Sequence, residues 1–593
     1  MRRYLDSLLS VSRVRSLVGY GLRSRLKEGY TTSHLRADLM AGLVVGVVAL
    51  PLSMALSIAS GVEPQRGLYT AIVAGIVASL LGGTRVQVTG PTAAFVVLLV
   101  PVVAKFGLGG LLVAGLLAGF IQLLMGVFRL GSLITFIPHP VTTGFTTGIA
   151  VVIATLQVKD VFGLELERAP ESYLDRWQVF YASRQTASLA ELAIAAFTLA
   201  LLLLGPRLTR RIPAPLLAIP AAALLALVLT RVFPGFEVAT IGSRFTSEVG
   251  GKTIAGIPPL PPLPVWPFTL PGADGAPFHL DFATLQALFP SALAIAMLGA
   301  IESLLSAVVA DGMTRTRHDP NAELIGLGVA NIVCPLFGGI AATGALARTA
   351  ANVRAGAESP LASVFHALFI LASTVALAPL VAYLPMAALA ALLLVVAKNM
   401  SEMRHFLHLL RVAPRSDVLV LLVCFFLTVF FDMVLAVGVG VVLAALLFMR
   451  RMAELTNTRL DTRTLEHMAL PEGVLLYEIA GPLFFGAAQK AMGVLETVHR
   501  SSQAVILSMG QVPTMDATGL VAFETLLANL RRHDHKVILA GLQPNVRQLL
   551  DRANITREAG KLAFAPDLEV ALSMAILHTA RGTNAASAPS VKG

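Results

Sequence analysis

Long apolar segments are the feature of this 593-residue chain that most limits how it can fold. Several of them approach or exceed the roughly 18 apolar residues that cross a bilayer as a helix. One, beginning near residue 418, reads VLVLLVCFFLTVFFDMVLAVGVGVVLAALLFM. Only 13% of the residues are charged, whereas soluble chains carry roughly 25%. We therefore predict a polytopic α-helical membrane protein.

Three regions of the chain differ in composition. Residues 1–35 form a basic segment, residues 36–452 are overwhelmingly apolar, and the remainder has the composition of a soluble domain. A Pro-rich stretch divides the apolar region into two repeats, about 36–232 and 283–451, which we expect to hold about seven spans each, or about 14 in all. Because seven is odd, the second repeat enters the membrane in the opposite orientation, as in transporters built from inverted repeats.

The charged loops predict the orientation of the protein. Lys and Arg collect in the N-terminal segment and in three later places, which are residues 207–211, 398–415 and 450–451. These all fall on one side in the predicted topology, and positively charged loops face the cytoplasm. Both termini are therefore predicted to be cytoplasmic. The net charge of +10 is explained in the same way and does not indicate nucleic-acid binding.

One short sequence pattern, called here the repeated phrase, occurs twice in the chain. Residues 80–95 read LLGGTRVQVTGPTAAF and residues 336–351 read LFGGIAATGALARTAA. Each runs from a Gly pair to a Thr-Gly that opens an apolar segment, which predicts two broken helices meeting near the middle of the membrane. Two helix N-termini facing each other favour an anion. Alternatively, the Gly and Thr residues only permit close helix packing, and the phrase alone leaves both interpretations open.

Two ionisable residues lie in these apolar segments. Glu302, in LGAIESLLSAVV, is costly to place in a bilayer and is a plausible proton carrier if it faces a cavity. Alternatively, it is a neutral side chain hydrogen-bonded between helices. Arg348 follows Gly344 by four residues, where its planar guanidinium suits a bound oxyanion. A permanent salt bridge between Arg348 and Glu302 is the other interpretation.

Several functional classes lack their sequence signals here. The chain shows no P-loop, nucleotide fingerprint, catalytic triad spacing or metal-ligand cluster, which argues against an ATP-driven pump and an enzyme, and predicts neither cofactor nor metal. Cys334 and Cys424 lie in apolar segments, so we interpret them as small core residues and not as a disulfide pair.

The C-terminal region predicts a small α/β domain over residues 466–580, followed by a disordered tail over 581–593. Strand-like runs such as GVLLYEIAG, AVILSMG and KVILAGL alternate with helical patterns such as AAQKAMGVLETVHR. In the stretch PTMDATGL, Asp516 is placed to cap the next helix. Phosphorylation of Thr518, or contact of this loop with a cytoplasmic partner, is the alternative interpretation.

Four motifs carry a family resemblance. GLYT at 67–70, VTGPTAAF at 88–95, IPHPVTTGFTTG at 137–148 and the C-terminal DATGL together resemble the SulP anion transporters, the relatives of solute carrier family 26. The C-terminal domain resembles a STAS domain. The resemblance implies a core and a gate domain, an elevator-like motion, a homodimer and a place in the bacterial inner membrane.

The resemblance also implies which residues form the site. It places the substrate between the third and tenth spans, at Thr89, Gly90, Pro91, Thr92 and Ala93 and at Gly344, Ala345, Ala347 and Arg348, with Leu52 and Leu56 lining the pocket. In sodium-driven bicarbonate members the position of Glu302 resembles an Asp. A Glu there is similar to the proton-coupled branch of the family.

A finer resemblance concerns the substrate. LPLSMALSIASGV, MLGAIESLLSAVVADGM, ARTAANVRAGA and IAGPLFFGAA are similar to the bacterial C4-dicarboxylate transporters of the DauA type. This implies proton-coupled import of succinate, fumarate, malate or aspartate. The alternatives are transport of bicarbonate, sulfate or chloride on the same fold, an anion channel, or a signalling scaffold that works through its STAS domain.

Overall fold

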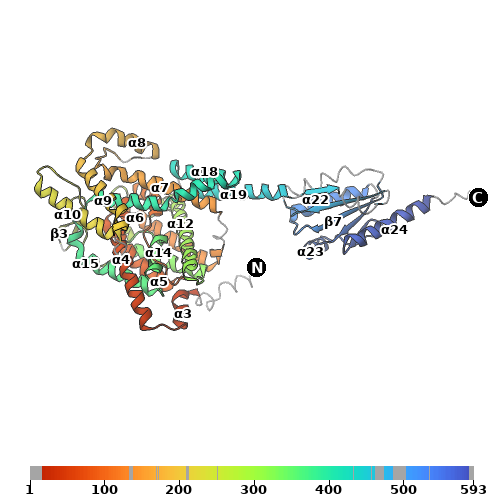
Figure 1. The fold of residues 1–593 in the computed structure, drawn as a ribbon, viewed down its shortest axis with the longest axis horizontal. Coiled ribbons are helices and arrows are strands. Elements are labelled where there is room, and N and C mark those ends of the chain that lie inside the picture. The colour runs from red at the N-terminus through yellow and green to blue at the C-terminus, as the bar shows by residue number, and fades with distance from the viewer. Residues whose placement is uncertain are drawn as a thin grey trace, which may run out of the picture. The chain divides into compact units, whose positions relative to one another are not determined.

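The computed structural model describes residues 17–586, except for residues 133–137, 169, 171, 209–212, 250, 432, 456, 461–469, 471–472, 485–501 and 533–534. The chain divides into two compact units, Met1–Val441 and Val442–Gly593 (Figure 1). The first unit is helical, and the second is built around a five-stranded sheet.

Helices make up the first unit, in two halves that follow the predicted repeats. The first half contains α3 (Tyr20–Lys27), α4 (Thr32–Ala59), α5 (Pro64–Leu81), α6 (Ala93–Val127), α7 (His139–Val161), α8 (Tyr173–Ala182), α9 (Leu189–Leu208) and α10 (Ala214–Val232). The second half contains α12 (Phe282–Thr314), α13 (Pro320–Val333), α14 (Leu346–Arg354), α15 (Leu361–Val381), α16 (Met386–Met400), α17 (Met403–Val412) and α18 (Arg415–Phe430). The last helix, α19 (Met433–Leu455), begins in the first unit and ends in the second.

The helices that can span a membrane fit the predicted seven-plus-seven plan. Nine helices in the described part of the chain are long and apolar enough to cross a bilayer, or ten if the bent pair Tyr173–Thr186 and Leu189–Gly205 counts as one span. α6 holds two helices joined at Gly107, whose φ of 70° is available to glycine without strain. The seven-plus-seven plan assigns its remaining spans to the shorter helices α5, α14 and α18, of which α14, with nine residues, is a half-helix.

The spanning helices pack as two groups. In the core group, α13 lies along α5 and α6, α12 along α6, and α15 along α4 and α5. In the gate group, α7 lies between α16 and α18, and α9 packs on α10 and α16. Contact between the groups is sparser. It involves α4, which meets α10 and α16, and α6, which meets α7. The two groups are the counterparts of the core and gate domains that the family resemblance implies.

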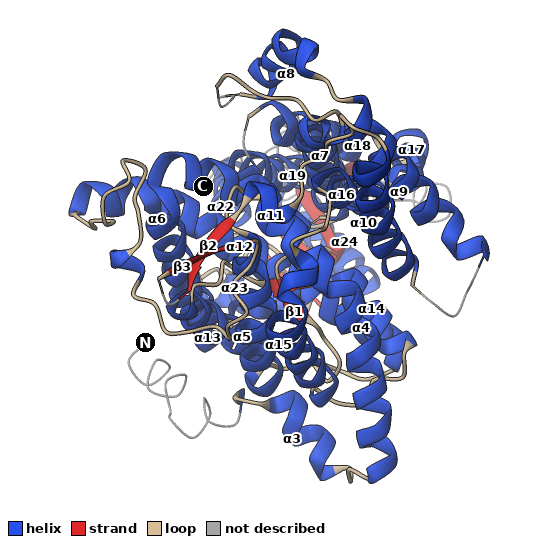
Figure 2. Ribbon diagram, turned by 90° about the vertical axis from the view of Figure 1, so that its left-hand side faces the viewer, coloured by secondary structure: helices blue, strands red, loops and turns tan. Residues whose placement is uncertain are grey.

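Two very short strands lie inside the core group. β1 (Thr89–Gly90) pairs antiparallel with β4 (Thr343–Gly344), and all four residues are buried. Figure 2 shows β1 enclosed by helices. The two copies of the repeated phrase therefore meet in space, as the sequence predicted, whereas their pairing as strands was not predicted.

The loop between the two halves contains elements that the sequence did not reveal. It carries α11 (Ile241–Arg244) and a hairpin of β2 (Thr246–Val249) and β3 (Lys252–Ala255). The hairpin strands are short and polar, so their sequence lacks the apolar alternation that predicts a half-buried strand.

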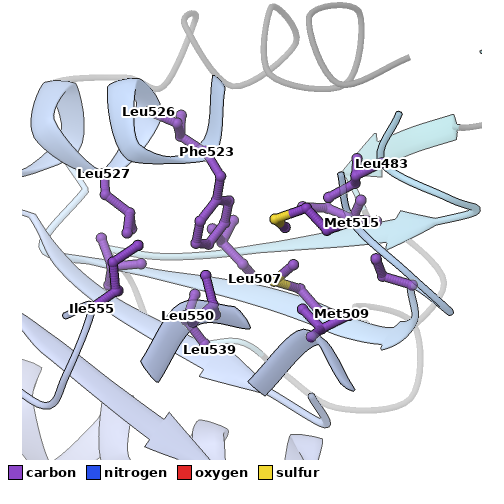
Figure 3. Packing of buried hydrophobic residues seen from close by; sticks show 14 of the residues in the cluster. Leu483, Leu507, Met509, Met515, Phe523, Leu526, Leu527, Leu539, Leu550 and Ile555 are labelled. Carbon is purple, nitrogen blue, oxygen red and sulfur yellow. The ribbon is translucent and has the colours of Figure 1, made fainter. Parts of the chain in front are cut away.

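The second unit is a sheet with helices on both faces. Its strands run in the order β5 (Asn457–Leu460), β6 (Val474–Ala480), β7 (Ala504–Gln511), β8 (Lys536–Ala540) and β9 (Leu562–Ala565), and all neighbours are parallel except β5 and β6. α22 (Ala517–Arg532) and α23 (Pro544–Arg552) share one hydrophobic cluster with the sheet, and α24 (Leu568–Ala586) shares another. Figure 3 shows Phe523 of α22 pointing toward the sheet above Leu507.

The predicted strands of the C-terminal domain are confirmed as β6, β7 and β8. The helix expected over AAQKAMGVLETVHR lies outside the described residues. α24 continues to Ala586. The disordered tail predicted over residues 581–593 is therefore wrong for residues 581–586, which form the end of this helix. Residues 587–593 lie outside the described part.

Small residues let α6 and α13 approach closely. A Cβ at Gly328 would lie 2.5 Å from Leu123 N and 2.8 Å from Gly119 O, both backbone atoms of α6. A Cβ at Gly119 would lie 2.7 Å from Ile332 N. Real Cβ atoms do not come this close to backbone, so each helix requires glycine where it meets the other.

Substituting Gly328→Ala should therefore destabilise the membrane unit, because overpacking of this kind costs about 1–3 kcal/mol. Thermal unfolding of the purified protein in detergent measures the effect. Gly312→Ala is the matched control, since nothing lies within 4 Å of its Cβ position in α12. That change should be neutral or slightly stabilising, because Ala exceeds Gly in helix propensity by about 1 kcal/mol. Equal effects of the two changes would refute the close approach.

Candidate anion-binding site

The β1–β4 pair brings two helix starts together. Thr89 lies opposite Gly344, and Gly90 lies opposite Thr343. Immediately after these strands, α6 begins at Ala93 and α14 begins at Leu346. The N-terminal turns of both helices therefore start from one small, buried junction in the core group.

Neither helix start is capped by its own N-cap side chain. Thr92, the N-cap of α6, is extended with φ −123° and ψ 157°, and Ala345, the N-cap of α14, has no side chain that could accept a hydrogen bond. The first N–H groups of a helix need acceptors, and an anion is a suitable one. The side chains of Leu346 and Ala347 in the first turn of α14 are exposed, whereas the residues on either side of them are buried.

Arg348 adds a positive charge to the junction. Its side chain is 4% exposed, and its Nη2 donates to the carbonyl oxygen of Pro91. Its Nη1 is buried and has no hydrogen-bond partner. A buried charge without a full set of partners is costly, and an oxyanion would supply the missing acceptor.

Gly90 is required for this position of Arg348. A Cβ at residue 90 would lie 2.7 Å from Arg348 Nη1 and 3.3 Å from its Nη2. The guanidinium thus lies directly against the backbone at Gly90. At the opposite strand, a Cβ at Gly344 would lie 2.3 Å from Gln87 Nε2, so both glycines of the Thr-Gly pairs make room for polar side chains.

Glu302 lies beside the junction but does not pair with Arg348. Its Oε2 accepts a hydrogen bond of 2.9 Å from Thr92 Oγ1, and its side chain is partly exposed. Arg348 binds the Pro91 carbonyl and forms no ion pair with Glu302. The permanent salt bridge that the sequence left open is therefore wrong for this conformation, because each group has a different partner. The hydrogen bond from Thr92 fits the second interpretation of Glu302 and leaves its coupling role a prediction.

The two predicted pocket leucines have different surroundings. Leu56 is 2% exposed within α4. Leu52 is partly buried and packs against the hydrophobic cluster of α9, α10 and α16, so it lies where the core group meets the gate group. Their role in lining a pocket remains a prediction.

A buried carboxylate braces the loop that leads into β1. Glu323 of α13 is 2% exposed. Its Oε2 accepts from the backbone N–H groups of Gly83 and Thr84 and from the Thr84 hydroxyl, at 2.7–3.0 Å. Its Oε1 accepts from Gln87 Nε2 at 2.7 Å and from Ser303 Oγ at 3.2 Å. This one side chain therefore links the loop before β1 to α12 and α13.

The loop before β4 has a similar brace. Asn331 of α13 donates to the Ala342 carbonyl at 2.9 Å and accepts from the Ala342 N–H at 2.7 Å, so it forms two hydrogen bonds to the backbone of one residue. Its Nδ2 also donates to Gln122 Oε1 of α6. α13 therefore holds both strands of the junction, one through an acid and one through an amide.

α14 itself fixes the segment that leads into β1. Asn352 Nδ2 donates to the Val86 carbonyl at 2.8 Å, and Thr349 Oγ1 accepts from the Val88 N–H at 3.1 Å. Ser363 of α15 donates to the Gln87 carbonyl at 2.6 Å. The backbone of residues 86–88 is thus bonded to side chains of the second repeat.

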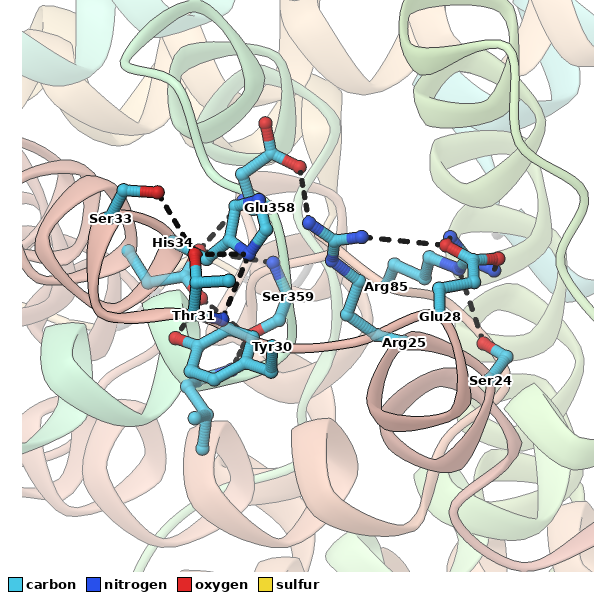
Figure 4. Close-up of polar contacts among 12 residues, drawn as sticks. Ser24, Arg25, Glu28, Tyr30, Thr31, Ser33, His34, Arg85, Glu358 and Ser359 are labelled. Atoms are coloured by element: carbon cyan, nitrogen blue, oxygen red, sulfur yellow. Dashed lines mark hydrogen bonds and ion pairs between the residues drawn. The ribbon is translucent and has the colours of Figure 1, made fainter.

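The N-terminal segment attaches to the same loops. Gly19 and Gly21 donate their N–H groups to the carbonyls of Leu81 and Gly82. Figure 4 shows Arg25 between Glu28 and Glu358, the latter in the loop after α14. The α3 region is therefore bound to the loops that flank both half-helices.

The pKa values of two side chains in this N-terminal contact are shifted by their surroundings. The hydrogen bond from Arg85 lowers the pKa of Glu28. Burial, and then the hydrogen bond of 2.7 Å to Asp38, raises the pKa of Tyr30 to about 12. Asp38 also accepts from the N–H groups of Glu358 and Ser359. These bonds connect the start of α4 to the loop after α14.

In the second unit, Asp516 lies where the capping interpretation places it. Its Oδ1 accepts from the Gly519 N–H at 2.7 Å, at the start of α22. Thr518 lies in the first turn of that helix. The capping interpretation explains this geometry, and a regulatory role for Asp516 or Thr518 remains a prediction.

The bracing residues escaped the sequence analysis for identifiable reasons. Glu323 is in the first turn of α13, where an acid is ordinary because it favours the helix dipole. Asn331 and Gln122 are uncharged, so they gave no signal. In the described residues, no group of three or more His, Cys, Asp or Glu side chains is arranged to hold a metal ion.

Comparison with known proteins matches both units. The model of the sulfate permease family matches residues 35–424, and that of the STAS domain matches residues 467–571. The Bacillus subtilis protein named "Putative sulfate transporter YvdB" is 39% identical over 540 residues, which are 91% of this chain and 97% of that protein. The bicarbonate transporter BicA of Picosynechococcus sp. is 29% identical over 561 residues, 89% of this chain and 93% of that one.

Solved structures show the same fold. Murine solute carrier 26 family member A9, in its inward-facing state, superposes with a TM-score of 0.81 at 19% identity, covering 97% of this chain and 98% of that chain. The transmembrane domain of a cyanobacterial BicA has a TM-score of 0.58 at 26% identity, covering 70% of this chain and 98% of that one.

Glu323→Gln tests whether the brace positions the junction. An amide nitrogen facing these donors would leave buried groups unsatisfied, at about 1–3 kcal/mol, so we expect anion uptake to fall by about tenfold or more. Ser303→Ala removes one of the five bonds and should have a smaller effect. The control Glu63→Gln alters a more exposed ion pair with Arg66, which contributes about 0–1 kcal/mol. If Glu323→Gln behaves like this control in folded protein, Glu323 does not position the site.

Proposed function

The chain belongs to the sulfate permease family and is an anion transporter with a C-terminal STAS domain, and we propose that it is a secondary transporter of a compact oxyanion, with sulfate and bicarbonate as the first candidates. The family is one of transporters, so the chain is not an enzyme. We further propose that it is a homodimer in a bacterial inner membrane, with both termini cytoplasmic.

The observation that carries the proposal is the unpartnered Nη1 of Arg348 beside two uncapped helix starts. An anion 4 Å from the guanidinium gains about 4 kcal/mol at an effective dielectric constant of about 20. Transporters commonly bind substrates at such discontinuous helices. Among the residues described at this junction, Arg348 is the one cationic side chain, which suits a substrate with a single compact charged group.

The names of the relatives also favour an inorganic oxyanion. The two reported above are named for sulfate and for bicarbonate. A C4-dicarboxylate is the second candidate, favoured by the motifs MLGAIESLLSAVVADGM and ARTAANVRAGA. Its second carboxylate would need a further donor, and the nearby hydroxyl of Thr92 already donates to Glu302.

Glu302 is proposed to couple transport to protons. When ionised, it places a negative charge beside the site and opposes an anion there. Protonation removes that charge, so a proton and an anion bind more favourably together than separately. The hydrogen bond from Thr92 Oγ1 connects Glu302 to the N-cap of α6. This makes the transporter a symporter of an anion and a proton.

Transport would proceed by alternating access. We propose that the core group carries the β1–β4 junction past the gate group, with Leu52 at the boundary between them. Because the strands, α3 and the braces of α13 all belong to the core group, the site would move as one rigid piece. The STAS domain is proposed to offer a surface to a cytoplasmic partner.

Uptake into proteoliposomes tests the substrate and the coupling. With an inward proton gradient, we expect labelled sulfate or bicarbonate to accumulate faster than without it. Glu302→Gln should abolish this acceleration while leaving uptake driven by the anion gradient. Uptake of succinate in place of both inorganic anions would make the second candidate correct. Acceleration that persists in Glu302→Gln would refute the coupling role.

Arg348→Gln tests the anion site itself. Loss of the guanidinium should weaken anion binding by about 100-fold or more, since truncating a buried charged partner costs roughly 3–5 kcal/mol. Arg354→Gln is the matched control, because Arg354 is exposed at the end of the same helix. Binding can be measured by anion-dependent thermal stabilisation. Comparable affinities in the two variants would place the anion elsewhere.

A further inference from the structure

Two histidines that the transport mechanism does not use lie in contact in the gate group. His139 is the first residue of α7, and His405 is in α17. Their Nε2 atoms are 3.0 Å apart, and their rings are stacked with centroids 5.0 Å apart. The two residues are 266 positions apart in the sequence, so the fold itself creates the contact.

The other nitrogen of His139 is held by hydroxyls. Thr142 Oγ1 donates its hydrogen to the His139 carbonyl at 2.9 Å, which leaves its lone pairs facing His139 Nδ1 at 3.3 Å. Thr143 Oγ1 lies 3.4 Å from the same nitrogen. With its proton on Nδ1, His139 presents the lone pair of Nε2 to His405. Histidines that bind metals are oriented in this way by a bond at the second nitrogen.

We propose that His139 and His405 form a binding site for a divalent transition metal ion such as Zn²⁺ or Ni²⁺. Two nitrogens bound tetrahedrally to one zinc ion at about 2.0–2.1 Å lie about 3.3 Å apart. The observed separation of 3.0 Å needs only a small outward rotation of the rings to admit the ion. Water fills the remaining coordination positions.

Neighbouring residues define what kind of ion fits. Two imidazoles suit Zn²⁺, Ni²⁺ or Cu²⁺, whereas Mg²⁺ and Ca²⁺ prefer oxygen ligands. His408 lies one turn after His405 with ring centroids 6.5 Å apart, and it is not arranged with the other two as a third ligand. Arg404 and Arg411 lie on the same short helix and oppose a cation. We therefore expect micromolar affinity, weaker than at a closed structural zinc site.

A bound ion would cross-link the gate group. α7 packs against both α16 and α18, and α17 is the segment between those two helices. An ion bound by His139 and His405 would join α17 to the first turn of α7. Since α16 and α18 already pack on α7, all three consecutive helices would then be attached to it. Because metal binding to the folded state alone stabilises it, the ion should raise the thermal stability of the protein.

Titration of the full-length protein, purified in detergent without an affinity tag, tests the proposal. Calorimetry with Zn²⁺ and, separately, with Ni²⁺ should show one ion bound per chain and a metal-dependent rise in the unfolding temperature. His139→Ala and His405→Ala should each weaken binding by about tenfold or more. His279→Ala, at an exposed loop position, is the matched control and should bind as the unaltered protein does.

Two results would overturn the proposal. If neither ion binds in the micromolar range, the contact is only a hydrogen bond between two imidazoles. If both alanine variants bind normally, the ion lies elsewhere. His405→Gln guards against a folding defect, because its amide still donates toward His139 but binds metal poorly. This variant should unfold at the unaltered temperature without metal and show no metal-dependent rise.

Discussion

The antiparallel pairing of Thr89–Gly90 with Thr343–Gly344 is the contact on which the rest of the membrane unit depends. It involves only four residues, yet it places the starts of α6 and α14 together. A strand pair this short cannot persist alone. It is maintained because Glu323, Asn331, Asn352 and Ser363 bond the backbone on either side of it. The buried polar network therefore holds the N-terminal ends of α6 and α14 at a fixed separation.

The two charged side chains at this junction, Arg348 and Glu302, differ in burial and in hydrogen bonding. Arg348 is buried with one donor unused, whereas Glu302 is partly exposed and bonded to Thr92. Since Arg348 and Glu302 form no ion pair, the guanidinium of Arg348 keeps an unused donor. A bound anion would accept a hydrogen bond from it and balance its charge. A permanent salt bridge would have closed the site. The separation of the two side chains is thus what the proposed symport of an anion and a proton requires.

Much of this architecture follows from the sequence, and the reason differs between elements. The membrane class and the seven-plus-seven plan rest on long apolar segments, a strong signal that needs no knowledge of contacts. The repeated phrase predicted broken helices, because Gly-rich stretches before Thr-Gly interrupt apolar runs. It could not predict the pairing of β1 with β4, since pairing depends on tertiary approach between residues more than 250 positions apart.

The bracing residues show a second limit on inference from sequence. Glu323 is recognisable as a buried acceptor of five bonds only once the loop of residues 83–87 is folded beside it. In the sequence it resembles any acid in the first turn of a helix. Likewise, the contact between His139 and His405 joins residues far apart in the sequence, and His405 lies in the stretch 398–415 that the sequence analysis treated only as a basic loop. Such sites are defined by proximity and carry no local pattern.

Ala347→Cys offers the most direct test that the β1–β4 junction binds the transported anion. Both native cysteines are buried and unpaired, whereas residue 347 is exposed in the first turn of α14, so a thiol-reactive probe should label that position selectively. The transported anion should slow the labelling at concentrations that saturate uptake, and should not slow labelling of Gly275→Cys in the exposed loop. Labelling at position 347 that is unaffected by a saturating anion would contradict the assignment of the site.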